Sequence, residues 1–201
     1  MKDGSVMTNP GVGNPNIVEP VGEIDPRIDL VNFKYTDGSG NLLFVSYSLH
    51  ADMVGGTKIS GDHPAAVRRK VELGIPGCKV MYFTGAQGDI NHIDVKEKGN
   101  TPKGYPYMLK VANILGGEVI KEYENITYHD ECDLDSVIKR VTVPLRHFKD
   151  EDYDWAMGII KSFKDGTFKQ NTMNKTADIA RALRIRNAYN GKDTMDLDVT
   201  V

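Results

Sequence analysis

The chain has 201 residues, of which 40% are hydrophobic and 26% are charged, and its formal net charge is −3. This length and composition are typical of a globular protein that buries a core, and no apolar run is long enough to cross a bilayer. Lysine and arginine are spread along the chain without a basic block, so we expect no nucleic-acid partner.

Residues 1–26 are predicted to form an extended arm. They contain four Xaa-Pro pairs, which disfavour helix at the preceding residue, and too few apolar side chains to fold alone. The first residues also lack the apolar stretch of a secretory signal, so we take the cytoplasm as the default compartment. Residues 27–201 are assigned to a single α/β domain.

The first elements after the arm are two strands, a helix and a further strand. Runs rich in β-branched and aromatic residues predict strands over 28–35 and 42–49, and the Gly-rich loop between them predicts an antiparallel hairpin. A helix is predicted from an N-cap at Asp62 to about Leu73, because Pro64 suits a first turn and Gly74 suits a helix end. The short apolar run 79–83 predicts a buried strand.

The remaining chain alternates again between helical and extended patterns. Apolar residues at helical spacing predict a helix over 107–123, in spite of Gly116 and Gly117. A strand is predicted over 137–145, and amphipathic helices over 150–163 and 175–189. This order predicts an α/β fold, with mixed α+β as the alternative, in which helices flank a layered sheet.

Polar side chains that could carry chemistry lie at the ends of these elements. His50 ends the second strand, where it could present a neutral imidazole to a metal or be an ordinary hydrogen-bonded histidine. Asp62 is explained by capping and by catalysis equally well. In the loop after the third strand, Gly85 and Gly88 permit close approach of a ligand, and Asp89, Asn91 and His92 offer a carboxylate, an amide and an imidazole.

Four segments resemble, in the same order, the neutral, non-lysosomal ceramidase family and its bacterial relatives. They are Ile24-Asp-Pro26 before a strand, His50 after the next strand, Ile59-Ser-Gly-Asp62 before a helix, and Gly85-Ala-Gln-Gly-Asp-Ile-Asn91 after a further strand. The family consists of zinc-dependent amidohydrolases. The resemblance covers residues 3–95 and continues weakly through the later helices.

With this resemblance we assign roles to seven residues. It implies zinc as the cofactor, with His50 as a ligand, and an N-acyl, lipid-like small molecule as the substrate. Asp62, Asp89 and Asn91 are assigned to the catalytic group, and Gln87, Gly88 and His92 to substrate binding. Asn91 stands where the ceramidases have a serine, and asparagine cannot act as a nucleophile, although its amide can donate a hydrogen bond to an oxyanion.

The other zinc ligands of the family belong to motifs that do not occur in this sequence. We therefore expect an incomplete catalytic domain, a fragment that is inactive alone and that forms homodimers through exposed sheet edges. Two alternatives stay open. One is a non-catalytic ceramidase-like module for binding or assembly, and the other is an unrelated metallohydrolase or phosphatase with a metal cluster of Asp62, His63, Asp89 and His92.

Overall fold

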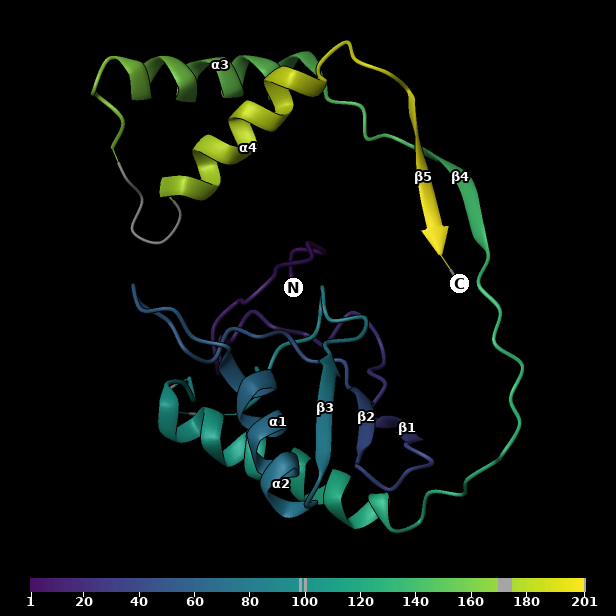
Figure 1. Ribbon diagram of the computed structural model, residues 1–201. Helices are drawn as coiled ribbons and strands as arrows, with labels where there is room; N and C mark the ends of the chain where they lie inside the picture. Colours follow the sequence, from purple (N-terminus) through teal and green to yellow (C-terminus); the bar gives the residue numbers. More distant parts are fainter. Residues whose placement is uncertain (98, 100, 170–174, 201) are drawn as a thin grey trace. The chain divides into compact units, whose positions relative to one another are not determined.

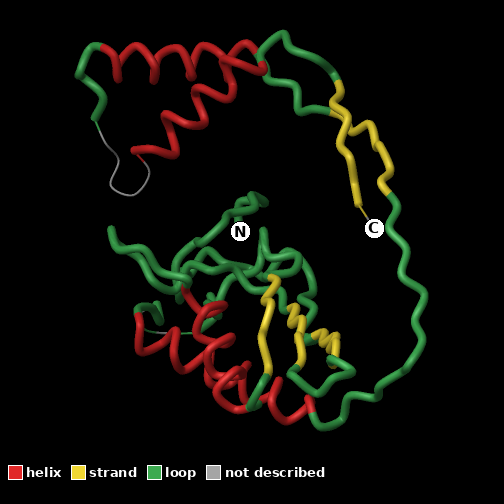
Figure 2. Tube along the Cα trace, in the orientation of Figure 1, coloured by secondary structure: helices red, strands yellow, loops and turns green. Residues whose placement is uncertain are grey.

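A computed structural model describes residues 1–97, 99, 101–169 and 175–200. The chain divides into two compact units, Met1–His129 (unit 1) and Asp130–Val201 (unit 2). The described residues form four helices and two small sheets, which confirms the mixed α/β fold (Figure 1, Figure 2). The assignment of residues 27–201 to one domain stays a prediction, and each unit is described by itself.

Unit 1 is built on a three-stranded sheet with the order β1-β2-β3. Strand β1 (Asp29–Lys34) pairs antiparallel with β2 (Asn41–Ser46), which confirms the predicted hairpin. Its loop closes through the Tyr35 N–H, which donates to the Gly40 carbonyl at 3.0 Å. Strand β3 (Cys78–Phe83) pairs parallel with β2, so the two strands and the helix between them form a βαβ unit.

Helices α1 (Asp62–Gly74) and α2 (Tyr105–Tyr123) complete unit 1, and α1 packs against both β3 and α2. Gly116 lies where the two helices meet, since a Cβ there would be 2.7 Å from Lys70 Cγ. The glycine that lowers helix propensity thus permits close helix contact. The core of unit 1 consists of Leu43, Val45, Leu49, Met53, Val67, Val71, Ile75, Cys78, Val80, Met108, Ala112, Leu115 and Val119.

The two faces of the sheet differ in exposure. Leu43, Val45 and Val80 face the helices and are buried. On the opposite face, Met81 is 45% exposed and Phe83 is 46% exposed. The prediction that residues 79–83 form a buried strand was therefore wrong for this face, because a short apolar run does not reveal whether one or both sides are covered.

Residues 1–28 contain no helix or strand and lie partly against the rest of unit 1. The Lys2 N–H donates to the Asn16 carbonyl within the arm, and the Gly13 N–H donates to the Val95 carbonyl at 2.9 Å. The second bond places the arm beside the loop that follows β3.

Unit 2 consists of a helix pair and a two-stranded ribbon. Helices α3 (Asp150–Lys164) and α4 (Lys175–Ala188) share a small core of Ala156, Ile160, Ala182 and Ile185. Strand β4 (Ile138–Pro144) pairs antiparallel with β5 (Thr194–Thr200), which the sequence analysis did not predict. In the described ranges of the chain, no helix is both long and apolar enough to cross a membrane.

Candidate functional site

His50 follows β2 directly and is held by the loop after β3. Its N–H donates to the Ile90 carbonyl at 3.1 Å, and its ring Nδ1 lies 3.3 Å from the Gln87 carbonyl oxygen. A carbonyl only accepts, so this contact places the hydrogen on Nδ1 and leaves a lone pair on Nε2. His50 is exposed, and a backbone carbonyl that fixes the second ring nitrogen in this way is typical of metal-binding histidines.

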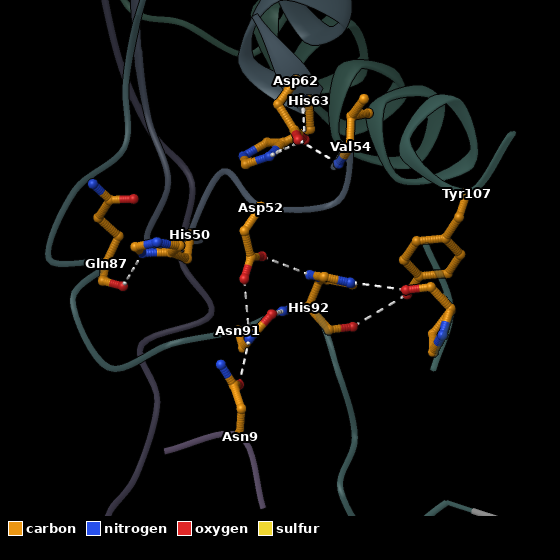
Figure 3. Close-up of polar contacts among 11 residues, drawn as sticks. Asn9, His50, Asp52, Val54, Asp62, His63, Gln87, Asn91, His92 and Tyr107 are labelled. Carbon is orange, nitrogen blue, oxygen red and sulfur yellow. Dashed lines mark hydrogen bonds and ion pairs between the residues drawn. The ribbon is translucent and has the colours of Figure 1, made fainter. Parts of the chain in front are cut away.

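Asp52 and His92 form a second group, separate from His50 in Figure 3. Asp52 Oδ1 lies 3.0 Å from His92 Nδ1, and the Pro102 carbonyl lies 2.9 Å from His92 Nε2. The His92 side chain is only 4% exposed. Since both ring nitrogens already have acceptors, His92 links Asp52 to Pro102, and its assignment to substrate binding stays a prediction that this geometry does not favour.

Asn91 lies next to this pair, with its amide fully engaged. Its Nδ2 donates to Asn9 Oδ1 at 2.8 Å and to Asp52 Oδ2 at 3.3 Å, while its Oδ1 accepts from the His92 N–H at 2.7 Å. Both amide hydrogens are used, so a substrate oxyanion would have to displace Asn9 or Asp52. The side chain of Asn9 thus connects the arm to Asn91 in the loop after β3 (Figure 3).

Asp62 begins α1 in an unusual backbone conformation. Gly61 is the N-cap, so the prediction that Asp62 is the cap was wrong by one residue. Asp62 has a φ of 48°, in the left-handed region, which Asp tolerates because its side chain bonds locally. Its buried carboxylate accepts from the Val54 N–H at 2.8 Å and from the His63 N–H at 2.6 Å, and so joins the loop before α1 to the helix.

His63 is fully buried behind Asp62. Its Nδ1 lies 3.5 Å from Asp62 Oδ1, and within the described residues neither ring nitrogen makes a hydrogen bond. The ring packs edge-on against Tyr82, whose buried hydroxyl also lacks a described partner. Burial lowers the pKa of the His63 imidazole, and the nearby Asp62 carboxylate opposes only part of this effect. His63 is therefore a neutral core histidine near neutral pH.

The loop after β3 exposes its remaining polar residues. Gly88 and Asp89 are exposed, and Gln87 contributes its carbonyl to His50. Gly85 has a φ of 58°, and a Cβ there would be 2.7 Å from Ser48 Oγ, so glycine allows this loop to pass close to the end of β2.

The described residues do not form a complete metal site. No group of three or more His, Cys, Asp or Glu side chains among them could hold a metal ion. The alternative of a self-contained cluster of Asp62, His63, Asp89 and His92 is therefore wrong for this structure. Of the predicted site residues that the structure describes, His50 has a ring Nδ1 fixed by a carbonyl, and a catalytic zinc typically takes three protein ligands.

Comparisons of the chain with protein-family models, with curated proteins and with solved structures gave no match.

The structure groups the predicted residues differently from the sequence. It brings His50 to Gln87 and joins Asn91 to His92, but it keeps Asp62 with His63 and leaves Asp89 exposed without a described partner (Figure 3). The sequence analysis assigned no role to Asp52, although this residue lies only two positions after His50. Asn9 was also missed, because no local pattern links the arm to Asn91.

Proposed function

We propose that the chain is part of a zinc-dependent hydrolase of amide bonds, N-acyl and ceramide-like, to whose site it contributes His50 and the loop of residues 85–92. The observation that supports this proposal is the contact between His50 Nδ1 and the Gln87 carbonyl, which leaves Nε2 of this exposed residue without a hydrogen-bond partner among the described residues. The resemblance of four ordered segments to the neutral ceramidases points to the same role. Zinc, when bound, supplies Lewis-acid chemistry.

The residues of this chain provide one ligand position and a scaffold. Asp52 and His92 fix the loop beside His50, and Asp62 fixes the entry into α1. In this proposal Asp89 shapes the site, because it is exposed in the loop whose Ile90 carbonyl accepts from the His50 N–H. The Asn91 amide contacts substrate after Asn9 is displaced. The remaining zinc ligands come from outside the described residues, and this chain alone does not hydrolyse N-acyl substrates.

A second function, a non-catalytic binding or scaffold module, is favoured by one observation. The described residues hold no group of three metal-binding side chains, so they keep the α/β framework without a metal centre of their own. In that case the contact between His50 and Gln87 only stabilises the loop.

Zinc titration followed by NMR of the histidine side chains tests the proposal. His147 is the control, because it is an exposed histidine whose ring is not fixed by a hydrogen bond. Its side chain is 73% exposed, and its Nε2 lies 3.7 Å from Asp193 Oδ1, which is too far for a hydrogen bond. A carbonyl that fixes the ring of a metal-binding histidine typically raises metal affinity by about 10–100-fold, so we expect His50 to bind zinc at least ~10-fold more tightly than His147.

Two results of this titration would contradict the proposal in different ways. Equal affinities at His50 and His147 would remove the metal role and favour the scaffold module. Tight stoichiometric zinc that His50→Ala abolishes would show that the chain holds a complete site, against the expectation that most ligands lie elsewhere.

A further inference from the structure

Strand β3 is an edge strand, and the direction of its backbone groups follows from its neighbours. The Asn41 N–H donates to the Gly77 carbonyl and the Tyr47 N–H donates to the Phe83 carbonyl, so the odd-numbered residues 77–83 face β2. The Cys78 N–H donates instead to the Ile75 carbonyl, away from β2. The direction of the backbone N–H and C=O groups alternates from residue to residue along a strand. The N–H and C=O groups of residues 78, 80 and 82 therefore point to the outer edge of the sheet.

Only part of this outer edge is covered. Glu72 of α1 accepts from the Val80 N–H through Oε1 at 3.1 Å, so a carboxylate takes the place of a neighbouring strand there. Among the described residues, no hydrogen-bond partner is found for the N–H and carbonyl of Tyr82. An edge strand with free backbone groups is a template for pairing with another strand, and Glu72 restricts that pairing to the segment beyond Val80.

The exposed face of the same sheet carries a row of aromatic rings that reaches this edge. The Phe33 and Phe44 rings pack edge-to-face at 5.4 Å, and the Phe44 and Phe83 rings stack at 5.7 Å. The row crosses all three strands and ends at Phe83, on the open edge of β3. Aromatic cross-strand pairs stabilise sheets, so the end of the row favours a further apolar side chain beside Phe83.

Small side chains beside this edge leave space for a neighbour. A groove of about 400 Å³ lies between the first turns of α1, at Gly61, Pro64 and Ala65, and the edge of β3. Arg68 also lines this groove with a 55% exposed side chain, so a second α1 beside the first would have to pass this arginine.

From these observations we propose that two copies of the chain associate through the outer edge of β3, antiparallel about a two-fold axis at Phe83. Tyr82 then pairs with Thr84 of the second copy, and Phe83 lies opposite Phe83 of the second copy, which continues the aromatic row. The chain turns at Gly85, where φ is 58°, so the second copy leaves the edge before it reaches Glu72. Because of the two-fold symmetry, the backbone N–H and carbonyl of Tyr82 find partners on both copies. The proposal does not depend on the proposed hydrolase function.

The edge of β1 fits this role less well. The Asn32 side chain on β1 donates to the Tyr128 hydroxyl at 2.6 Å, and Lys34 lies over the Tyr128 ring at 5.5 Å. The segment after α2 thus lies beside β1, whereas the β3 edge beyond Val80 has no such neighbour among the described residues of unit 1. The general expectation of dimers through sheet edges is thereby narrowed to one edge.

Light scattering coupled to size exclusion tests the proposal with a matched pair of variants. Phe83→Lys places like charges opposite each other at the axis, while Phe33→Lys makes the same change at the far end of the row. The two side chains are 46% and 41% exposed, and each loses one contact with Phe44. Between about 1 µM and about 500 µM we expect the wild type and F33K to approach twice 22.3 kDa, and F83K to need at least ~10-fold higher concentration.

A wild type that stays monomeric over this range would overturn the proposal, and so would equal weakening by F83K and F33K. Circular dichroism shows whether each variant is folded. Should F83K not fold, residue-resolved hydrogen exchange of the wild type decides. The Tyr82 amide must then exchange more slowly as concentration rises, relative to the Val80 amide, which Glu72 holds in every state, and an unchanged ratio would overturn the pairing.

Discussion

Replacement of Asp62 by asparagine separates a structural role from a catalytic one. The two carboxylate oxygens accept from two different N–H groups, those of Val54 and His63. Asparagine keeps the shape and tolerates the left-handed φ, but it has only one acceptor oxygen, and its NH₂ then faces a backbone N–H. One of the two bonds is lost, and a buried donor is left unpaired.

The expected loss follows from the burial of this carboxylate. A hydrogen bond to a charged group contributes about 1.5–3 kcal/mol, and an unpaired buried donor costs a similar amount, so we expect D62N to lower the free energy of unfolding by about 2–4 kcal/mol. With a typical slope of about 2 kcal/mol per M urea, the midpoint of unfolding falls by about 1–2 M. Urea denaturation followed by far-ultraviolet circular dichroism measures this shift.

Asp89→Asn is the matched control, because Asp89 is exposed and no described residue bonds its carboxylate. The same chemical change there should shift stability by less than about 0.5 kcal/mol. Equal midpoints for D62N and D89N would refute the reasoning and would favour catalysis over a structural role as the explanation of Asp62.

Two further predictions concern His63 and Gly85. Burial lowers the folded-state pKa of His63 below the unfolded value of about 6.5, so the unfolded chain takes up a proton first as the pH falls. The free energy of unfolding should then drop below about pH 6.5 with a slope of up to ~1.4 kcal/mol per pH unit, and His63→Phe should remove this contribution in urea titrations at about pH 7.5 and about pH 5.5. Identical losses in both proteins would contradict this assignment. Gly85→Ala combines a φ of 58° with a Cβ 2.7 Å from Ser48 Oγ and should cost about 1–3 kcal/mol, whereas Gly88→Ala, with no atom within 4 Å of the added Cβ, should change little. Thermal melts of the two variants that coincide would show that the loop at residue 85 adapts freely.

Most elements of the fold could be predicted because their signals are local. The hairpin loop marked β1 and β2, and Pro64 and Gly74 marked α1 to within a residue or two. Strand β5 was missed although its apolar residues alternate, because aspartates at 196 and 198 disfavour a strand. Arg140 pairs with Asp198 at 2.8 Å, and the Thr142 hydroxyl donates to Asp196 at 2.7 Å. The partners that allow these aspartates in a strand therefore come from β4, more than fifty residues earlier.

The candidate site could be predicted only in part for the same reason. His50 and the loop of residues 85–92 follow strands that the sequence places correctly, and parallel pairing of β2 with β3 brings their ends together. The hydrogen-bond partners of the site residues could not be predicted. Asp52 meets His92 across 40 positions, and the assignment of Asp62 to catalysis overlooked Val54, whose N–H it binds. Contacts between loops depend on the assembled fold and leave no periodic pattern in the sequence.

The hydrogen bond between Asn9 and Asn91 links the order of the arm to the occupancy of the loop. The two residues are 82 positions apart, and the bond uses an amide hydrogen that a bound molecule would also need. Any molecule that accepts from the Asn91 amide in place of Asn9 therefore loosens the arm, and a tightly held arm weakens binding of that molecule by the same factor. Protease sensitivity of residues 1–26 would in that case report on what the loop has bound, without any assay of a reaction.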